Sequence, residues 1–232
     1  MKALIICGGK GTRVQQINKE IPKAMFPIAG KPILQHQIEW LKKYGINEIV
    51  FCIGYLGDQI IDFFGDGSKF DIVAEYSKET EPLGTGGAIK NAQEFVDDTF
   101  LVVFGDLMID MNLENLLTFH KKHGGLATIV VHKTDHPWDS DLIKLDNNGK
   151  IVEIIKKPGK MERYPSEISK TSIYVLEKDV MEMIHGKCDF EQEILPKIVK
   201  LGKAFGYYTE EFIKDMGTPE RYEKIKKMFE NI

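Results

Sequence analysis

Short apolar runs that alternate with amphipathic segments along the first half of the chain constrain its fold more than any other feature. The run at residues 2–7 ends in two glycines, and comparable runs lie at 48–53, 71–76 and 100–104. The segments between them have helical spacing and cover residues 33–44, 57–64 and 86–95. Short apolar runs joined by helical segments are typical of buried parallel strands with crossover helices. The pattern predicts an α/β fold built on a mostly parallel sheet.

The second half of the chain has a different rhythm. Its helical segments lie at 112–123, 190–201 and 219–231, and its strand-like runs lie at 126–132, 141–146, 150–157 and 171–176, with a strand pair near 204–214. Asn147-Asn148-Gly149 is typical of a hairpin turn between antiparallel strands. We therefore expect a Rossmann-like sheet flanked by helices, with an inserted antiparallel section, in a single domain over residues 1–232. Residues 158–170 are the most loop-like segment and a candidate flap.

Composition narrows the class of protein. The chain has 232 residues and a formal net charge of −4, which indicates no basic surface for a nucleic acid polymer. The apolar run at the N-terminus is too short for a signal peptide or a membrane span, so we expect no membrane partner. Cys7, Cys52 and Cys188 are odd in number and far apart, which argues against disulfides or zinc and favours buried thiols in a reducing cytoplasm. A homo-oligomer stays open.

A glycine-rich loop, Gly8-Gly9-Lys10-Gly11-Thr12-Arg13, directly follows the first predicted strand. Ligands of open α/β sheets bind at the carboxyl ends of the strands, where this loop lies. Glycines let backbone N–H groups approach phosphate oxygens closely, and Arg13 adds a charged guanidinium. The dinucleotide-binding fingerprint requires glycine where Val14 stands, and the P-loop sequence Gly-Lys-Ser/Thr does not occur in the chain. The loop on its own leaves a phosphate site and a structural turn both open.

The residues that follow turn this loop into a longer signature. Pro22-Lys23-Ala24-Met25 is followed by Pro27 and by Gly30-Lys31-Pro32. The whole pattern, GGxGTR…PKxMxPxxGKP, resembles the signature of the sugar-phosphate nucleotidyltransferases. The resemblance implies that Arg13 and Lys23 hold the triphosphate and stabilise the charge of the transition state. It also implies a nucleotide-binding part over about residues 1–110 and a sugar-phosphate-binding part over about 111–232.

A second glycine-rich segment, Glu81-Pro82-Leu83-Gly84-Thr85-Gly86-Gly87-Ala88, resembles the loop that packs against the nucleoside in this family. The resemblance implies that Pro82, Gly84 and Thr85 bind the nucleotide. PLGTGGA is similar to the loop of guanylyltransferases that act on mannose or heptose 1-phosphates, and a small group of uridylyltransferases acting on N-acetylmuramate 1-phosphate has a similar loop. GTP is therefore favoured as the donor. The alternative is a uridylyl- or cytidylyltransferase that acts on another, acidic acceptor.

Two aspartates complete the implied phosphate chemistry. Asp106 lies at the end of the most apolar predicted strand, where it could also cap a helix, and Asp215 lies in the sequence KDMGTP. The resemblance implies that both aspartates bind Mg²⁺, which accepts two carboxylates together with phosphate oxygens and water. The implied reaction transfers a nucleoside monophosphate from a nucleoside triphosphate to a sugar 1-phosphate and releases pyrophosphate. In it Arg13, Lys23 and Asp106 are catalytic.

The implied sugar site departs from the family pattern. The family commonly has Glu-Lys-Pro where this chain has Lys156-Lys157-Pro158, and asparagine where it has Lys170. Lys157 keeps the lysine that holds the sugar phosphate in the family. Two interpretations of Lys156 and Lys170 stay open. Either both side chains point to solvent, or they bind an extra anionic group of an acidic acceptor.

Asp141, in Asp139-Ser140-Asp141-Leu142, resembles the corresponding residue of heptose 1-phosphate guanylyltransferases and is a candidate ligand of substrate hydroxyls. Turn chemistry explains these aspartates as well. A non-catalytic regulatory subunit of the same fold is the alternative from another functional class. The presence of Arg13, Lys23, Asp106 and Asp215 together argues against it, because a silent copy has no need of all four.

Overall fold

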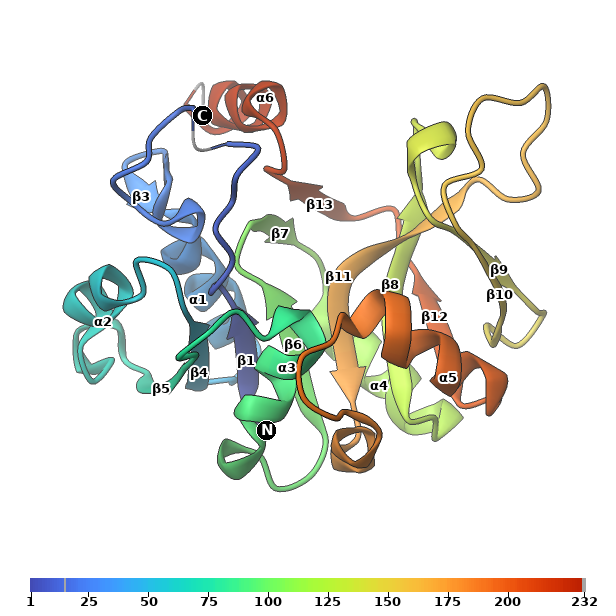
Figure 1. The fold of residues 1–232 in the computed structure, drawn as a ribbon, viewed down its shortest axis with the longest axis horizontal. Coiled ribbons are helices and arrows are strands. Elements are labelled where there is room, and N and C mark those ends of the chain that lie inside the picture. Colours follow the sequence, from blue (N-terminus) through green and yellow to red (C-terminus); the bar gives the residue numbers. More distant parts are fainter. Residues whose placement is uncertain (15, 231–232) are drawn as a thin grey trace.

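The computed structural model describes residues 1–14 and 16–230, and one nine-stranded sheet forms its centre. Four strands of the first half of the chain lie side by side in the order β6, β1, β4, β5 and run parallel (Figure 1). Their bounds are Ala3–Ile6 for β1, Glu48–Ile53 for β4, Val73–Lys78 for β5 and Phe100–Phe104 for β6. The predicted α/β fold with a Rossmann-like parallel part is confirmed.

The predicted antiparallel section is also confirmed, and it joins the same sheet through β11 (Ile168–Leu176). This long strand pairs antiparallel with β6, with β8 (Ala127–Lys133) and with β9 (Leu142–Leu145). β9 in turn forms a hairpin with β10 (Ile151–Ile155). Gly149 in the connecting turn has a φ of +76°, which glycine adopts without strain.

Helices cover both faces of the sheet (Figure 1). One face carries α1 (Ile33–Lys43), α2 (Asp58–Phe64) and α4 (Leu113–His123), and the other carries α3 (Gly84–Asn91) and α5 (Leu195–Lys200). Two faces become apolar because successive strand side chains point to opposite sides. Ala3 and Ile5 of β1 thus belong to one buried cluster, whereas Leu4 belongs to the other.

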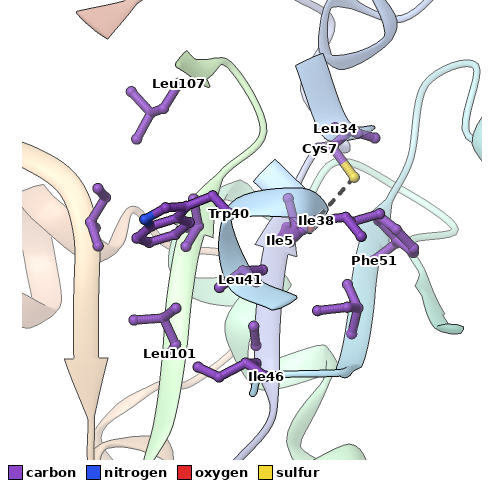
Figure 2. Packing of buried hydrophobic residues seen from close by; sticks show 14 of the residues in the cluster. Ile5, Cys7, Leu34, Ile38, Trp40, Leu41, Ile46, Phe51, Leu101 and Leu107 are labelled. Carbon is purple, nitrogen blue, oxygen red and sulfur yellow. Dashed lines mark hydrogen bonds between the residues drawn. The ribbon is translucent and has the colours of Figure 1, made fainter. Parts of the chain in front are cut away.

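The packing of α1 shows how sequence spacing becomes tertiary structure. Its residues Leu34, Ile38 and Leu41 recur at helical spacing and lie in one buried cluster with Ile5 of β1 (Figure 2). Burial of such a side chain stabilises the fold by about 1.5–3 kcal/mol. The helix ends close to the predicted 33–44, and Gly45, whose φ is +73°, follows it.

The predicted strand pair near 204–214 is wrong in its pairing, although both strands exist. β12 (Ala204–Tyr208) runs parallel to β8, whereas β13 (Phe212–Asp215) pairs antiparallel with β7 (Leu107–Asp110) in a separate two-stranded sheet. β7 begins directly after the Gly-Asp turn that ends β6, so the local pattern shows no partner for it. The pairing carries Asp215 from the end of the chain to the end of β6.

The C-terminal helix α6 (Pro219–Glu230) packs against a small ribbon formed by β2 (Pro27–Ile28) and β3 (Lys31–Pro32). Tyr222 packs edge-on against Phe26 with ring centroids 5.4 Å apart, and its hydroxyl donates a 2.8 Å hydrogen bond to the Pro27 carbonyl. These contacts fix the segment that follows the first glycine loop. Residue 231, the predicted end of this helix, lies outside the described residues.

Other predicted boundaries shift by a few residues. The helix predicted at 86–95 begins already at Gly84 and gives way to a short 3₁₀ turn after Asn91. The helix predicted at 190–201 begins with a π-helical turn over Phe190–Ile194. The end of the candidate flap, 168–170, belongs to β11. No helix in the described part of the chain is long and apolar enough to cross a membrane.

Candidate active site

Glycines lie where the carboxyl ends of β1, β4 and β6 approach one another. A Cβ atom on Gly54 would lie 2.8 Å from the carbonyl oxygen of Gly8, and one on Gly105 would lie 3.0 Å from the Cβ of Cys7. The Tyr55 N–H group donates a 3.2 Å hydrogen bond to the Gly8 carbonyl, which joins two of the loops. A side chain at Gly8, Gly54 or Gly105 would push the strand ends apart, so this close approach requires glycine.

A cavity of about 670 Å³ opens at these strand ends, a size typical of small-molecule sites. All but one of the residues predicted to bind the nucleotide line it, namely Gly8, Gly9, Gly11, Arg13, Lys23, Pro82, Gly84, Thr85 and Asp106. Thr12 is exposed and lies outside this lining. Tyr55, Glu79 and Glu81, to which the sequence patterns assigned no role, line the cavity as well.

Lys23 begins a short 3₁₀ turn (Lys23–Met25), and its ammonium group donates a short hydrogen bond to the Asp106 carboxylate. The side chains are 14% exposed for Lys23 and 28% exposed for Asp106. Gly11 packs on the lysine, because its φ is +60° and a Cβ there would lie 3.2 Å from the Cβ of Lys23. The first glycine loop, the PKxM segment and the end of β6 therefore meet at one point.

Asp215 reaches the same place through the pairing of β13 with β7. The Met216 N–H group donates a 3.0 Å hydrogen bond to the Asp106 carbonyl, which brings the two aspartate segments together. The Asp215 carboxylate accepts hydrogen bonds from Arg221 Nη1, 2.8 Å to each oxygen, and from the Gly217 N–H group at 2.8 Å. Burial would raise the pKa of Asp215, but the bonds and charge of Arg221 outweigh it and hold that pKa below its ordinary value.

Arg13 adds a further cation to this region. A Cβ atom on Gly217 would lie 3.7 Å from Arg221 Nη1 and 3.8 Å from Arg13 Nη2, so both guanidinium groups border the turn that follows Asp215. Arg13 also lines the cavity, as Lys23 does. Guanidinium and ammonium groups beside a glycine-lined cavity can bind the oxygens of a polyphosphate.

The carboxylates of Asp106 and Asp215 form a donor set that fits Mg²⁺. Oxygen ligands suit this ion, which keeps several positions for phosphate oxygens and water. Zinc prefers nitrogen and sulfur ligands instead. Among residues 1–14 and 16–230, no group of three or more His, Cys, Asp or Glu side chains could hold a metal ion. A magnesium ion held by these two carboxylates would therefore complete its shell with phosphate oxygens and water.

The second glycine loop is held by the segment that precedes α5. The Gly86 N–H group donates a 3.0 Å hydrogen bond to the Cys188 carbonyl, and the Phe190 N–H group donates one of 2.8 Å to Thr85 Oγ1. Gly84 has a φ of +75°, and a Cβ there would lie 2.5 Å from the Cys188 carbonyl oxygen. These contacts place the loop rigidly, with Gly84 and Thr85 on the cavity wall.

The residues predicted to bind the sugar phosphate divide into an exposed and a buried pair. Lys156 and Lys157 are exposed, and Lys157 Nζ lies 3.0 Å from Asp139 Oδ1. Lys170 and Asp141 have side chains only 11% and 9% exposed, and Lys170 Nζ lies 3.4 Å from Asp141 Oδ2. The interpretation that both variant lysines point to solvent agrees with Lys156 and is wrong for Lys170, because carboxylates hold that ammonium inside the protein.

The sequence motifs did not identify several residues that contact the site residues. Arg221 pairs with Asp215, Glu191 pairs with Lys170 at 2.6 Å, and Gly54 meets the first glycine loop. Arg221 follows Asp215 by six residues, in the first turn of a predicted helix, so its proximity could have been read from the sequence. Glu191 and Gly54 belong to distant segments, and no local pattern identifies them.

Comparison with known proteins assigns this arrangement to a class. The chain belongs to the nucleotidyl transferase family, which it matches over residues 2–231. The resemblance drawn from GGxGTR…PKxMxPxxGKP is therefore confirmed. Among solved structures, HddC from Yersinia pseudotuberculosis is 30% identical, with a TM-score of 0.84 and coverage of 98% of this chain and 99% of that one.

The names of the curated relatives differ in the nucleotide that they give, a uridylyl group in some and a guanylyl group in others. The UTP–glucose-1-phosphate uridylyltransferase of Synechocystis sp. is 35% identical over 221 residues, which cover 88% of this chain and 57% of that protein. Mannose-1-phosphate guanylyltransferase 1 of Arabidopsis thaliana is 34% identical over 229 residues, which cover 96% of this chain and 63% of that protein. The chain thus spans less than two thirds of the length of either relative.

Proposed function

We propose that the chain transfers a nucleoside monophosphate from a nucleoside triphosphate to a sugar 1-phosphate, in a Mg²⁺-dependent reaction that forms a nucleotide-sugar and pyrophosphate. GTP is the favoured donor, and a heptose or mannose 1-phosphate is the favoured acceptor. The meeting of Arg13, Lys23, Asp106 and Asp215 at the edge of a glycine-lined cavity carries this proposal. Anionic groups can be bound there from several sides at once.

This reaction needs control of charge more than acid–base chemistry. A phosphate monoester has its second pKa at about 6, so the attacking oxygen of the sugar 1-phosphate is already anionic near neutral pH. That oxygen forms a bond to the α-phosphorus in line with the bond that breaks, and pyrophosphate leaves with the electron pair. Lys23 and Arg13 stabilise the charge that develops on the phosphate oxygens. When bound by Asp106 and Asp215, Mg²⁺ supplies further positive charge there.

Carboxylates in the cavity support guanine as the base. Glu79 and Glu81 line the cavity beside the second glycine loop, and Glu81 is exposed to it while Glu79 is half-buried. Burial raises the pKa of Glu79. The hydrogen bond that its carboxylate accepts from the Leu83 N–H group opposes this rise. Guanine has neighbouring N–H donors that one carboxylate can accept together, whereas uracil flanks its single N–H group with carbonyl oxygens. Glu81 is therefore the candidate acceptor for a guanine base.

Sequence identity to the curated relatives does not distinguish the two bases. Identity to the uridylyltransferase and to the guanylyltransferase is nearly the same, 35% against 34%. HddC from Yersinia pseudotuberculosis, 29% identical in its complex with GMP-PN, supports a guanine nucleotide. The glycine loop PLGTGGA supports the same base, so GTP remains the proposed donor.

Pyrophosphate release with every pair of substrates tests the proposal. GTP, UTP and CTP are each combined with mannose, heptose, glucose and N-acetylmuramate 1-phosphates, and we expect the highest kcat/KM for GTP with mannose or heptose 1-phosphate. Glu81→Gln should lower kcat/KM for GTP by about tenfold and narrow its preference over UTP, because a neutral amide loses the paired acceptor. Glu94→Gln, at an exposed acid outside the cavity lining, is the matched control.

The possible outcomes separate the alternatives. A preference of the unchanged protein for UTP or CTP would overturn the guanine assignment and leave the transferase assignment standing. No pyrophosphate from any pair, with nucleotide binding retained, would support a regulatory subunit of the same fold.

The favoured setting is the cytoplasm, which fits the free, buried thiols of Cys7, Cys52 and Cys188. Burial raises the pKa of the first two, so neither is suited to act as a nucleophile.

A further inference from the structure

Lys170 lies between two carboxylates beside the nucleotide cavity. Its Nζ atom is 2.6 Å from Glu191 Oε2 and 3.4 Å from Asp141 Oδ2. The side chains of Lys170, Glu191 and Asp141 are 11%, 18% and 9% exposed. β11 contributes the lysine, the residue before β9 is the aspartate, and the π-helical turn before α5 contributes the glutamate. One ammonium group thus has counter-ions from two other segments.

The formal charge of this cluster is negative, because one ammonium faces two carboxylates. Burial would lower the pKa of Lys170, but the charges and hydrogen bonds of Glu191 and Asp141 outweigh it and raise that pKa above its ordinary value of 10.5. Lys170 therefore keeps its proton at neutral pH, and its charge is already matched. An anionic group on a ligand would meet an overall negative cluster rather than a spare cation.

The two carboxylates differ in how fully they are engaged. Glu191 accepts a short hydrogen bond from the Tyr174 hydroxyl and one of 3.3 Å from Ser172 Oγ on one oxygen, and its other oxygen forms the close ion pair. Asp141 is held by longer contacts, 3.2 Å from the Lys157 backbone N–H and 3.3 Å from Gln192 Nε2. A carboxylate offers about four lone-pair positions. Asp141 therefore retains capacity to accept hydrogen bonds from a ligand, whereas Glu191 acts as the internal anchor.

The cluster borders the cavity through two contacts. Phe104 lines the cavity, and its ring centroid lies 6.2 Å from that of Tyr174, whose hydroxyl donates to Glu191. Thr85 also lines the cavity and accepts a hydrogen bond from the N–H group of Phe190, the residue before Glu191. The cluster is thus adjacent to the nucleotide cavity, on the side built by the second half of the chain. An acceptor bound on this side of the cavity would lie near the cluster, in which Asp141 Oδ2 is 3.4 Å from Lys170 Nζ.

We propose that Lys170 is a positioning residue, which holds Asp141 so that the carboxylate accepts hydroxyl groups of the acceptor sugar. The negative charge of the cluster then selects against acceptors that carry a further carboxylate or phosphate. This inference rests on the proposed transfer to a sugar 1-phosphate. It assigns the cation at Lys170 to the protein's own carboxylates and not to an acidic substrate.

Matched acceptors test the charge selection. Mannose and mannuronic acid 1-phosphates differ only in carrying a neutral or a carboxylate group at C6, and glucose and glucuronic acid 1-phosphates form a second such pair. We expect kcat/KM to be at least about tenfold higher for the neutral member of each pair. Equal or better turnover of the acidic members would overturn the proposal.

Substitution of the lysine tests its positioning role. Lys170→Met should raise KM for the neutral acceptor by about tenfold, with a smaller change in kcat and an unchanged KM for the nucleoside triphosphate. Lys170→Arg should restore part of the loss, because it keeps a charged donor. A loss confined to the acidic acceptors would mean that Lys170 binds the substrate directly, and this result would overturn the proposal.

A second variant covers the case in which Lys170→Met does not fold. Lys170→Met combined with Glu191→Gln keeps the formal charge of the cluster, and we expect it to fold and to retain the raised KM for the neutral acceptor. A KM equal to that of the unchanged protein would overturn the positioning role. If no acceptor yields pyrophosphate although calorimetry detects binding of the nucleoside triphosphate, the proposed function itself fails, and the role of Lys170 fails with it.

Discussion

The proposed nucleotide side and the proposed acceptor side of the site are built in different ways. On the nucleotide side, glycines at the ends of adjacent strands leave a cavity with exposed backbone, and Lys23 lies against it. On the acceptor side, Asp141, Lys170 and Glu191 come from three segments and neutralise one another in part. One side thus depends on the absence of side chains, and the other depends on a balance of charged side chains.

This contrast explains why the chain keeps its family's pattern on one side and leaves it on the other. Where two backbones touch, as at Gly8 and Gly54, glycine is the only amino acid that fits. A buried charge cluster can be built from many combinations of residues, provided that every charge keeps a partner. Lys170, Glu191 and Asp141 form such a cluster, because without Lys170 both carboxylates would lose their cation inside the protein.

The largest effect is expected from the two aspartates, on which the nucleotide side depends. Asp106→Asn and Asp215→Asn should each lower kcat on the order of 10³-fold, because they remove the proposed metal ligands. Asp146→Asn changes an exposed aspartate in a hairpin turn and should leave kcat unchanged. Removal of Mg²⁺ with a chelator should abolish turnover, and added Mg²⁺ should restore it. Substantial activity of either site variant would place the metal elsewhere.

Lys23 is expected to follow. Lys23→Met should lower kcat by roughly 10²-fold, because it removes a cation that stabilises the phosphate oxygens of the transition state. Pyrophosphate release under saturating substrates measures this loss. Lys19→Met, at an exposed lysine of the same loop, is the control. Equal kinetics of the two variants would show that the ion pair of Lys23 with Asp106 serves the fold alone.

The glycines allow packing and ligand binding to be separated. A Cβ on Gly9 would meet no atom within 4 Å, whereas one on Gly54 would lie 2.8 Å from a backbone oxygen. Gly9→Ala should therefore leave the Tm unchanged while weakening binding of the nucleoside triphosphate by about tenfold, since the new methyl group blocks the approach of phosphate. Gly54→Ala should destabilise the fold by about 1–3 kcal/mol. Calorimetry and thermal unfolding of both variants measure the two effects, and unchanged nucleotide affinity in Gly9→Ala would contradict a phosphate site at this loop.

The smallest expected effect concerns the acceptor side at alkaline pH. Because the pKa of Lys170 is raised above 10.5, its ion pairs stabilise the fold fully below that pH and lose their effect as the pH rises through the folded-state pKa. The difference in Tm between the unchanged protein and Lys170→Met should be constant near neutral pH and should narrow as the pH rises beyond 10.5 through the raised pKa. Lys133→Met, at an ion pair 67% exposed on the lysine, should show little difference at any pH. A Lys170 difference that does not narrow would contradict the charge pairing.

Most strands of the central sheet could be predicted from the sequence, because each has a recognisable local pattern. Apolar runs that end in glycine predicted β1, β4 and β6 nearly to the residue, and the Asn-Asn-Gly turn predicted the β9–β10 hairpin. The pairing of β13 with β7 was missed, since it joins segments about half a chain apart and each is too short to show its partner. Most residues of the cavity lining lie in the motifs that the sequence shows, whereas Gly54, Tyr55 and Glu79 lie outside them and were not predicted.

The sequence alone predicted a phosphate site, because GGxGTR…PKxMxPxxGKP resembles the signature of the family to which the chain belongs. The partners of the remaining charges become visible only in the folded structure. Lys170 was assigned to Glu191 and Asp141 because the fold brings three distant segments together. The role of a charged side chain depends on its nearest opposite charge, because the Coulomb energy falls with distance. The sequence does not show which distant segments will be neighbours in the fold.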